Sequence, residues 1–179
     1  LYTDQEEKEI NIDVQQAETI VPLPDAYAGK LKGILPNTDG RGYGFFFLNR
    51  EDAEASMYEL QTTEDQVLKG SILINLYENL LHGSIPPDWF TEQLITYLSK
   101  ETNTLLYTAG LGYISNCVRL YPDQYTALET RLWELICTHP VSQHRLLTFR
   151  SCMHMVQTEE SIENYIPYGK MKTLRKDVC

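Results

Sequence analysis

Four histidines are the residues of this sequence best suited to chemistry at neutral pH: His82, His139, His144 and His154. Imidazole ligates zinc and moves protons near neutrality. A helical zinc site has two histidines four residues apart in an HExxH pattern, which does not occur in the sequence. His139 and His144 are separated by Pro140 and a spacing of five, so they do not share one helical face. We therefore expect none of the histidines to bind a metal.

Nucleophilic chemistry has equally little support. The cysteines are scattered without a CxxC pair, at Cys117, Cys137, Cys152 and Cys179. The first three lie among apolar neighbours in helical stretches, so we predict small buried thiols rather than a disulfide framework or a metal site. Cys152 and His154 are two apart, and on a helix they point in different directions. They do not make a catalytic pair.

The acidic residues and glycines also have structural explanations. Glu159 and Glu160 directly follow Thr158, the predicted cap of a short helix, where the helix dipole favours carboxylates. The glycine-rich stretch Gly40–Gly44 lies between predicted strands and is expected to form a turn. No GxSxG elbow, P-loop or GxGxxG pattern follows a strand. We therefore assign no catalytic residue and no metal ligand.

Composition argues against nucleic acid and membrane as partners. The formal net charge is −10, whereas nucleic acid and anionic lipid attract a positive patch. No apolar run reaches the length of a membrane span, and no signal peptide is present. The chain begins at Leu1, as a processed protein or a fragment would, so the compartment stays open between the periplasm and the cytoplasm of a bacterium.

Residues 1–48 have the pattern of short β-strands. Glu9–Val14 alternates apolar and polar residues, 18–23 and 31–35 look similar, and the apolar run 45–48 is a last candidate. Between them, the segment PNTDGRGYG combines a proline with three glycines, which is typical of a hairpin turn. We predict that residues 1–48 are the end of a β-sandwich domain.

From Asn49 onward the apolar period is helical. The sequence predicts helix N-caps at Asn49, Thr63, Asn103 and Ser142. Gly83 is expected to end the second helix, and Pro86 with Pro87 to open the third. Thr158 is the predicted cap of a seventh helix that ends at Pro167.

The helix starts recur at a regular interval. Thr63, Asn103 and Ser142 are 40 and 39 residues apart, and one helical hairpin fits between each pair of starts. HEAT and armadillo repeats, whose helix pairs stack into a superhelix, have a period of roughly 40–47 residues. A plain helical bundle with similar apolar stripes is the alternative. The predicted fold is therefore mainly α, with HEAT- or armadillo-like hairpins over residues 49–179 and a tail from Tyr168 that looks truncated.

The join between the two parts resembles a known boundary. The run ILPNTDGRGYGFFFLNREDAEASMYEL (34–60) is similar to the segment of M1-family zinc aminopeptidases where the last strand of a β-sandwich leads into the C-terminal helical domain, as in the endoplasmic-reticulum aminopeptidases. The resemblance covers most of residues 30–166. It continues through Asp65, Lys69, Tyr77, Gly83, Pro86 or Pro87, Leu98 and Glu101.

Other positions depart from the family pattern. Gly44 and Phe45 stand where an aromatic–arginine pair is common, and Lys69 stands where arginine is usual. The HExxH and GxMEN motifs belong to the family's preceding catalytic domain and do not occur in this sequence, so no catalytic residue carries over. The resemblance implies a zinc-dependent parent hydrolase, with the zinc in that catalytic domain, and a helical domain that closes over it and over the bound peptide.

The implied function is that of a non-catalytic C-terminal domain that restricts access of peptides to a metallo-aminopeptidase. Arg145 and Arg150 are the predicted peptide contacts, because an acidic chain has few cations and arginine binds carboxylates well. The alternative is that both are solvated or paired with Glu159 or Glu160. A helical-repeat scaffold for protein–protein interaction fits the period equally well, whereas an independent hydrolase has no supporting motif.

Overall fold

The computed structural model of the protein describes residues 9–14, 16–27, 29–122 and 125–155. Within these residues the chain is mainly α, as predicted, with six α-helices, the short 3-10 helix η1 (Asp25–Tyr27) and no β-strand. The chain divides into two compact units, Leu1–Ile85 and Pro86–Cys179, which are called the N-terminal and the C-terminal unit below.

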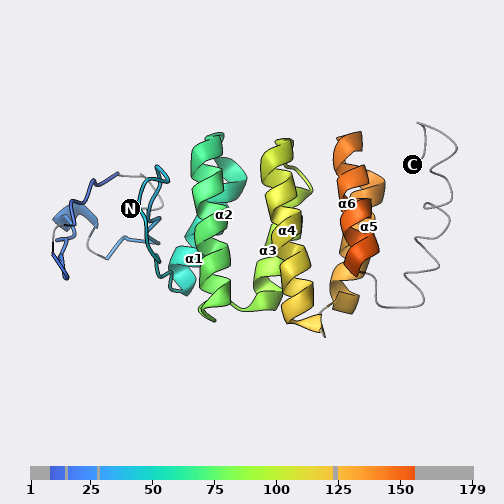
Figure 1. Ribbon diagram of the computed structural model, residues 1–179. Helices are drawn as coiled ribbons and strands as arrows, with labels where there is room; N and C mark the ends of the chain where they lie inside the picture. Colours follow the sequence, from blue (N-terminus) through green and yellow to red (C-terminus); the bar gives the residue numbers. More distant parts are fainter. Residues whose placement is uncertain (1–8, 15, 28, 123–124, 156–179) are drawn as a thin grey trace, which may run out of the picture. The chain divides into compact units, whose positions relative to one another are not determined.

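In the N-terminal unit, α1 (Arg50–Thr62) packs against α2 (Gln66–Leu81) (Figure 1). Asn49 caps α1 as predicted. Its side chain accepts a hydrogen bond from the N–H of Asp52, whose carboxylate accepts one from the N–H of Asn49. This reciprocal capping box satisfies donors that the first turn of a helix leaves open.

The second helix has a different cap from the predicted one. Asp65, not Thr63, is the N-cap of α2, and its Oδ1 accepts from the N–H groups of Val67 and Leu68. Thr63 is the C-cap of α1, with its N–H bonded to the carbonyl of Glu59. Both residue types cap helices well, but the Asp65 carboxylate takes two of the open N–H donors. At the other end, Gly83 follows α2 with a φ of 76°, as the glycine prediction requires.

Contrary to prediction, none of the segments 9–14, 18–23, 31–35 and 45–48 is a strand in the residues that the structure describes. A strand needs a neighbouring strand to bond its backbone. Helix side chains take that role here. Asp52 accepts from the N–H of Ile34 at 2.7 Å, and Asn79 accepts from the N–H of Leu48 at 2.8 Å. The segment 34–48 is therefore irregular in conformation but hydrogen-bonded to α1 and α2.

The C-terminal unit contains two helix pairs (Figure 1). In the first, α3 (Pro87–Leu98) packs on α4 (Thr104–Leu120); in the second, α5 (Tyr125–Thr138) packs on α6 (Ser142–Met155). The pairs contact each other through α4 with α6 and α3 with α5. Their fully buried side chains include Phe90, Leu94, Tyr107, Ile114, Leu132 and Cys152. The order of the pairs is compatible with a helical repeat, which stays a prediction.

Several predictions for the helical part are confirmed. Pro86 is the N-cap of α3 with Pro87 at the first helical position, and the side chain of Asn103 caps α4. Cys117 and Cys152 are buried as predicted, whereas Cys137, also predicted to be buried, is only half-buried. The predicted seventh helix, with Thr158, Glu159 and Glu160, and the fourth cysteine, Cys179, lie outside the described residues.

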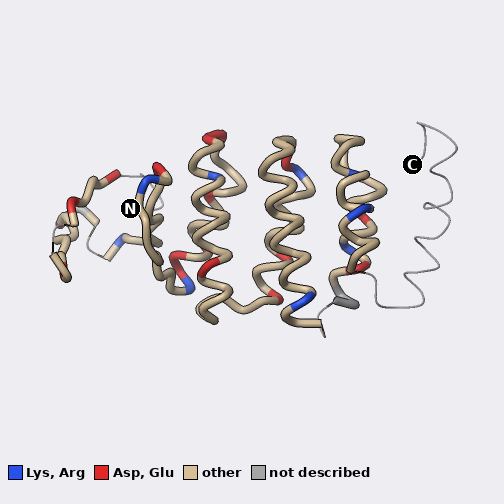
Figure 2. Tube along the Cα trace, viewed as in Figure 1, with Lys and Arg blue, Asp and Glu red and all other residues tan. Residues whose placement is uncertain are grey.

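Charged residues of both signs are interspersed along the helices (Figure 2). The cations in the described part are spread from Lys30 to Arg150 over both units rather than gathered on one helix. A dense basic face of the kind that binds nucleic acid is therefore not seen among these residues. None of the described helices combines the length and apolar character that crossing a membrane requires.

Candidate functional site

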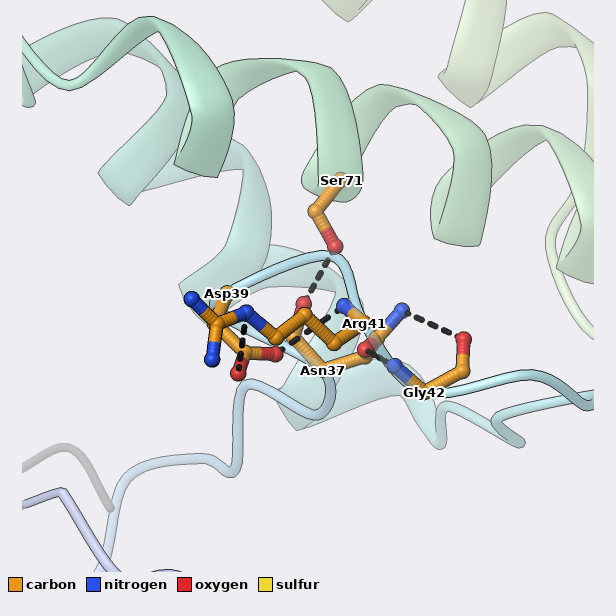
Figure 3. Close-up of polar contacts among 5 residues, drawn as sticks. All are labelled: Asn37, Asp39, Arg41, Gly42 and Ser71. Atoms are coloured by element: carbon orange, nitrogen blue, oxygen red, sulfur yellow. Dashed lines mark hydrogen bonds and ion pairs between the residues drawn. The ribbon is translucent and has the colours of Figure 1, made fainter.

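The glycine-rich loop 36–44 is held together by its own side chains (Figure 3). Asn37 has a φ of 56°, and its side-chain amide both accepts from the N–H of Gly42 at 2.6 Å and donates to the Gly42 carbonyl at 3.3 Å. The Asp39 carboxylate accepts from the N–H of Arg41 at 3.1 Å. A side chain at Gly42 would lie 2.7 Å from the Asn37 oxygen, so the closed turn requires glycine there.

One polar face of α2 holds this loop. Ser71, Asn75 and Asn79 are spaced four apart and all buried. Ser71 donates to the carbonyl of Asn37 (Figure 3), and Asn75 donates to the carbonyl of Pro36 at 3.0 Å. Asn79 donates to Phe46 O at 2.8 Å in addition to its bond with Leu48. We call these three side chains the polar ladder of α2.

The same loop exposes aromatic side chains. Tyr43, Phe45 and Phe47 are 106%, 46% and 66% exposed, whereas Leu48 is buried. The ring of Phe45 stacks on His82 with centroids 4.0 Å apart. Among the described residues, the backbone between Tyr43 and Phe47 makes only the bond from Phe46 O to the polar ladder. This edge offers apolar rings to a neighbour.

The C-terminal unit contains a second polar site, in which titratable side chains are buried where the α3–α4 turn meets the α5–α6 turn. We call it the buried polar cluster; it consists of Tyr97, Glu101, Thr104, Tyr107, His139, His144 and Thr148. Three of its hydrogen bonds join residues that are 40 or 41 positions apart in the sequence. Each of these bonds connects the first helix pair to the second.

His139 is held by two hydrogen bonds that fix its tautomer. Its Nδ1 accepts from the N–H of Val141 at 3.1 Å, so the proton lies on Nε2, which donates to the carbonyl of Leu98 at 3.0 Å. Both ring nitrogens of the neutral imidazole are therefore satisfied. His139 thus ties the end of α3 to the end of α5.

His144 is fully buried but only partly satisfied. Its Nε2 lies 3.1 Å from the hydroxyl of Thr104, and its Nδ1 is a buried atom without a hydrogen-bond partner. The ring stacks on Tyr107 at 4.1 Å and approaches the ring of His139 at 4.8 Å. Burial lowers the pKa of His144, and His139 adds to this effect, while the backbone and charge of Glu101 oppose it.

The carboxylate of Glu101 is buried but well bonded. Tyr97 donates its hydroxyl to one oxygen at 2.5 Å, and the N–H of Asn103 donates to the other at 2.6 Å. Burial and Glu101 together raise the pKa of Tyr97. Thr148 donates to the carbonyl of His144 and thus accepts from Tyr107, whose pKa burial raises to about 12. These phenols stay protonated at neutral pH.

The cluster therefore has a structural rather than a catalytic chemistry. The thiol of Cys117 on α4 is a candidate nucleophile by residue type. Burial raises its pKa to about 12, so it is not an activated thiolate. On α6, Cys152 is buried whereas His154 is exposed. No group of three or more His, Cys, Asp or Glu side chains in the described part of the chain is arranged to hold a metal ion.

The two predicted peptide contacts do not lie side by side. Both are on α6, but a spacing of five places them about 140° apart around the helix. Arg145 is half-buried and donates to the hydroxyl of Ser142 at 2.9 Å, whereas Arg150 is exposed. The structure therefore does not bring Arg145 and Arg150 into one clamp. Their alternative partners, Glu159 and Glu160, lie outside the described residues.

The polar ladder and the buried polar cluster were both missed by sequence reasoning. The only available signals were the spacing of four from Ser71 through Asn75 to Asn79 and the recurrence of polar residues 40 positions apart. No known protein-family model matches the chain, and neither a curated protein nor a solved structure matches it.

Proposed function

We propose that this chain is a non-catalytic helical region of an M1-like zinc aminopeptidase, which packs on the catalytic domain of its own polypeptide and limits the access of peptides. The observation that carries the proposal is the position of the residues behind the resemblance. Asp65 caps α2, Gly83 adopts the left-handed turn after it, and Pro86 caps α3. Each of these residues thus begins or ends a helix, and this supports the proposed similarity to the C-terminal helical domain of the family.

The Leu-x-x-Glu end of the resemblance also has a structural reason. Leu98 is the last residue of α3, and its carbonyl binds His139. Glu101 closes the following turn through the N–H of Asn103, which itself caps α4. Such contacts support a shared helical design, while the role of that design in peptide access remains our inference.

Exposed apolar side chains in the N-terminal unit support a neighbouring domain. Val14, Ile20 and Phe47 are 69%, 85% and 66% exposed, and Tyr43 projects fully. Large apolar side chains exposed to this degree are candidates for covering by a neighbouring domain. In the proposal, the β-sandwich and catalytic parts of the parent enzyme cover this surface, and the zinc and all covalent chemistry belong to the catalytic domain.

Within the proposal, Arg150 is the stronger of the two peptide contacts. It is exposed on α6, whereas Arg145 is partly buried and bonded to Ser142. A guanidinium binds a peptide carboxylate in a bidentate manner, but the two side chains project in different directions. The bound peptide would therefore meet one of them, and the substitution that affects peptide binding is Arg150→Ala.

The coding sequence upstream of Leu1 and the protein that it encodes test this proposal. We expect an HExxH motif with a downstream glutamate, and hydrolysis of an aminoacyl reporter by the complete protein. Phe47→Ser should cost less than about 0.5 kcal/mol in the isolated chain, where the ring is exposed, and about 2–3 kcal/mol in the complete protein, where it is covered. A complete protein without the motif and without activity contradicts the proposal.

A helical-repeat scaffold for another protein is the second candidate. The hydrogen bonds at separations of 40 and 41 favour it, because stacked repeats join equivalent positions one period apart. A scaffold requires no upstream catalytic domain. The same coding sequence therefore distinguishes the two candidates.

A further inference from the structure

We propose that His144 makes the docking of the α5–α6 pair on the α3–α4 pair sensitive to pH, so that protonation of this one imidazole loosens the contact. The inference rests on the C-terminal unit alone and does not depend on the function proposed above. It starts from the buried polar cluster, because this cluster supplies the hydrogen bonds between the two pairs.

All three inter-pair bonds lie close to the His144 ring. This ring bonds to Thr104 of α4 directly, and its stacking on Tyr107 positions the phenol that donates to Thr148 of α6. The third bond, from His139 to Leu98, is made by a ring 4.8 Å away. One imidazole therefore lies between all three connections.

Protonation changes what His144 requires. An imidazolium has two N–H donors, and Thr104 can serve only the one at Nε2. The Nδ1 is buried without a partner, so the second donor and part of the positive charge would be left unbonded in the core. With its proton on Nε2, the neutral ring leaves only an acceptor lone pair at Nδ1, which costs less.

The surroundings compensate for this charge only in part: the backbone and charge of Glu101 favour the imidazolium, but burial of the ring and the nearby His139 outweigh them. The Glu101 carboxylate, the negative group of the cluster, already accepts from Tyr97 and Asn103. His139 faces the ring with its own proton fixed on Nε2, and protonating it as well would add a like charge. The titratable groups around His144 come from every element packed there: Tyr97 and Glu101 from α3 and its turn, Tyr107 from α4, His139 from the α5–α6 turn, and Cys152 from α6.

The direction of the pH effect follows from the lowered pKa of His144. A free histidine titrates near 6.5, and the docked one at lower pH. The contribution to docking is therefore fully present above pH 6.5 and is lost as the pH falls from there through the lowered pKa of the docked form. One proton taken up on opening changes the docking equilibrium about tenfold per pH unit.

Hydrogen exchange in the full chain tests the proposal. After correction for the intrinsic pH dependence of exchange, the opening equilibrium of the α6 amides should rise by up to about fivefold between pH 6.5 and 5.5, because the opened ring is already half protonated at pH 6.5. His144→Phe keeps the stacking on Tyr107 but cannot titrate, so its opening should not change with pH. His154→Phe, at an exposed position of the same helix, should behave like the wild type.

An equal pH response in His144→Phe and wild type overturns the proposal. If His144→Phe does not fold, NMR titration of the histidines in the wild type decides. We expect the His144 ring to remain neutral until protection of α6 is lost. A ring that becomes protonated near pH 6.5 while α6 stays protected would overturn the proposal equally.

Discussion

Among the described residues, each unit contains a buried set of hydrogen-bonded polar side chains, and the two sets act by different physics. The polar ladder of α2 bonds backbone groups of the irregular segment 34–48 through two amides and a hydroxyl. The buried polar cluster bonds side chain to side chain across two helix pairs, and it contains two imidazoles, a carboxylate and two phenols. The ladder groups do not titrate, whereas the cluster is tied to protonation. Burial of polar groups thus gives a permanent attachment in one unit and a conditional one in the other.

The largest expected effect comes from removing Asn79, the ladder residue that bonds both Phe46 and Leu48. Asn79→Ala deletes the bonds to Phe46 and Leu48 and leaves their buried backbone groups without partners. We expect a loss of about 2–4 kcal/mol in the free energy of unfolding of the N-terminal unit. Chemical denaturation monitored by circular dichroism, with hydrogen exchange of α1 and α2, measures it.

Glu78→Ala is the matched control, because Glu78 is adjacent and exposed. It should change the unfolding free energy by less than about 0.5 kcal/mol. Similar losses in both variants would mean that the ladder does not hold the segment 34–48.

The second effect is a difference between the two units in how their stability depends on pH. Both tryptophans, Trp89 and Trp133, lie in the C-terminal unit, so their fluorescence reports its unfolding. Because the pKa of His144 is lowered from about 6.5, this unit should lose up to about 1 kcal/mol as the pH falls from 6.5 to 5.5. Exchange of the α2 amides, corrected for intrinsic rates, should stay unchanged. An equal loss in both units would erase the contrast between a permanent and a conditional attachment.

A third effect on stability concerns two glycines on α4. A Cβ added at Gly110 would lie 2.8 Å from Cδ2 of the buried Leu98, whereas one at Gly112 meets no atom within 4 Å. Gly112→Ala should therefore stabilise the chain by about 0.5–1 kcal/mol through helix propensity. Gly110→Ala should be about 1–2 kcal/mol less stable than Gly112→Ala because α3 and α4 must separate. Thermal unfolding of the two variants, compared directly, gives the difference; equal stability would show that the helices do not pack closely at Gly110.

The smallest effect on stability is expected at Arg150. Arg150→Ala should change the unfolding free energy by less than about 0.5 kcal/mol, since the side chain is exposed. In the complete enzyme, the same change should raise KM for peptides with a free C-terminus and leave a single-residue reporter unaffected. Equal kinetic effects on both substrates would assign Arg150 a supporting role in the fold only.

Local signals in the sequence predicted local structure well. Asn49 and Asn103 cap helices because their amides bond groups within three residues. The cap predicted at Thr63 was wrong because two residue types that cap helices, Thr63 and Asp65, stand two positions apart. The choice of Asp65 depends on hydrogen-bond geometry that a sequence pattern does not contain. The strand predictions were wrong because alternation indicates a half-buried strand but says nothing about whether a partner strand is present.

The two polar sites could not be predicted because their partners are distant in sequence. Asn79 bonds residues 31 and 33 positions away, and His144 bonds Thr104 across 40 positions. His139 and His144 were set aside for their poor metal-ligand spacing, although they come together across a turn as a buried ring pair. The hydrogen bonds that His139 and His144 make between the helix pairs can be seen only once the two pairs are packed together.

Zinc content and aminopeptidase activity, measured side by side for this chain and for the complete translation product of its gene, test the central claim most directly. We expect no stoichiometric zinc and no hydrolysis of an aminoacyl reporter for the chain, and one bound zinc with activity for the complete product. A tightly bound zinc in the chain itself, or a complete product without zinc and activity, would contradict it.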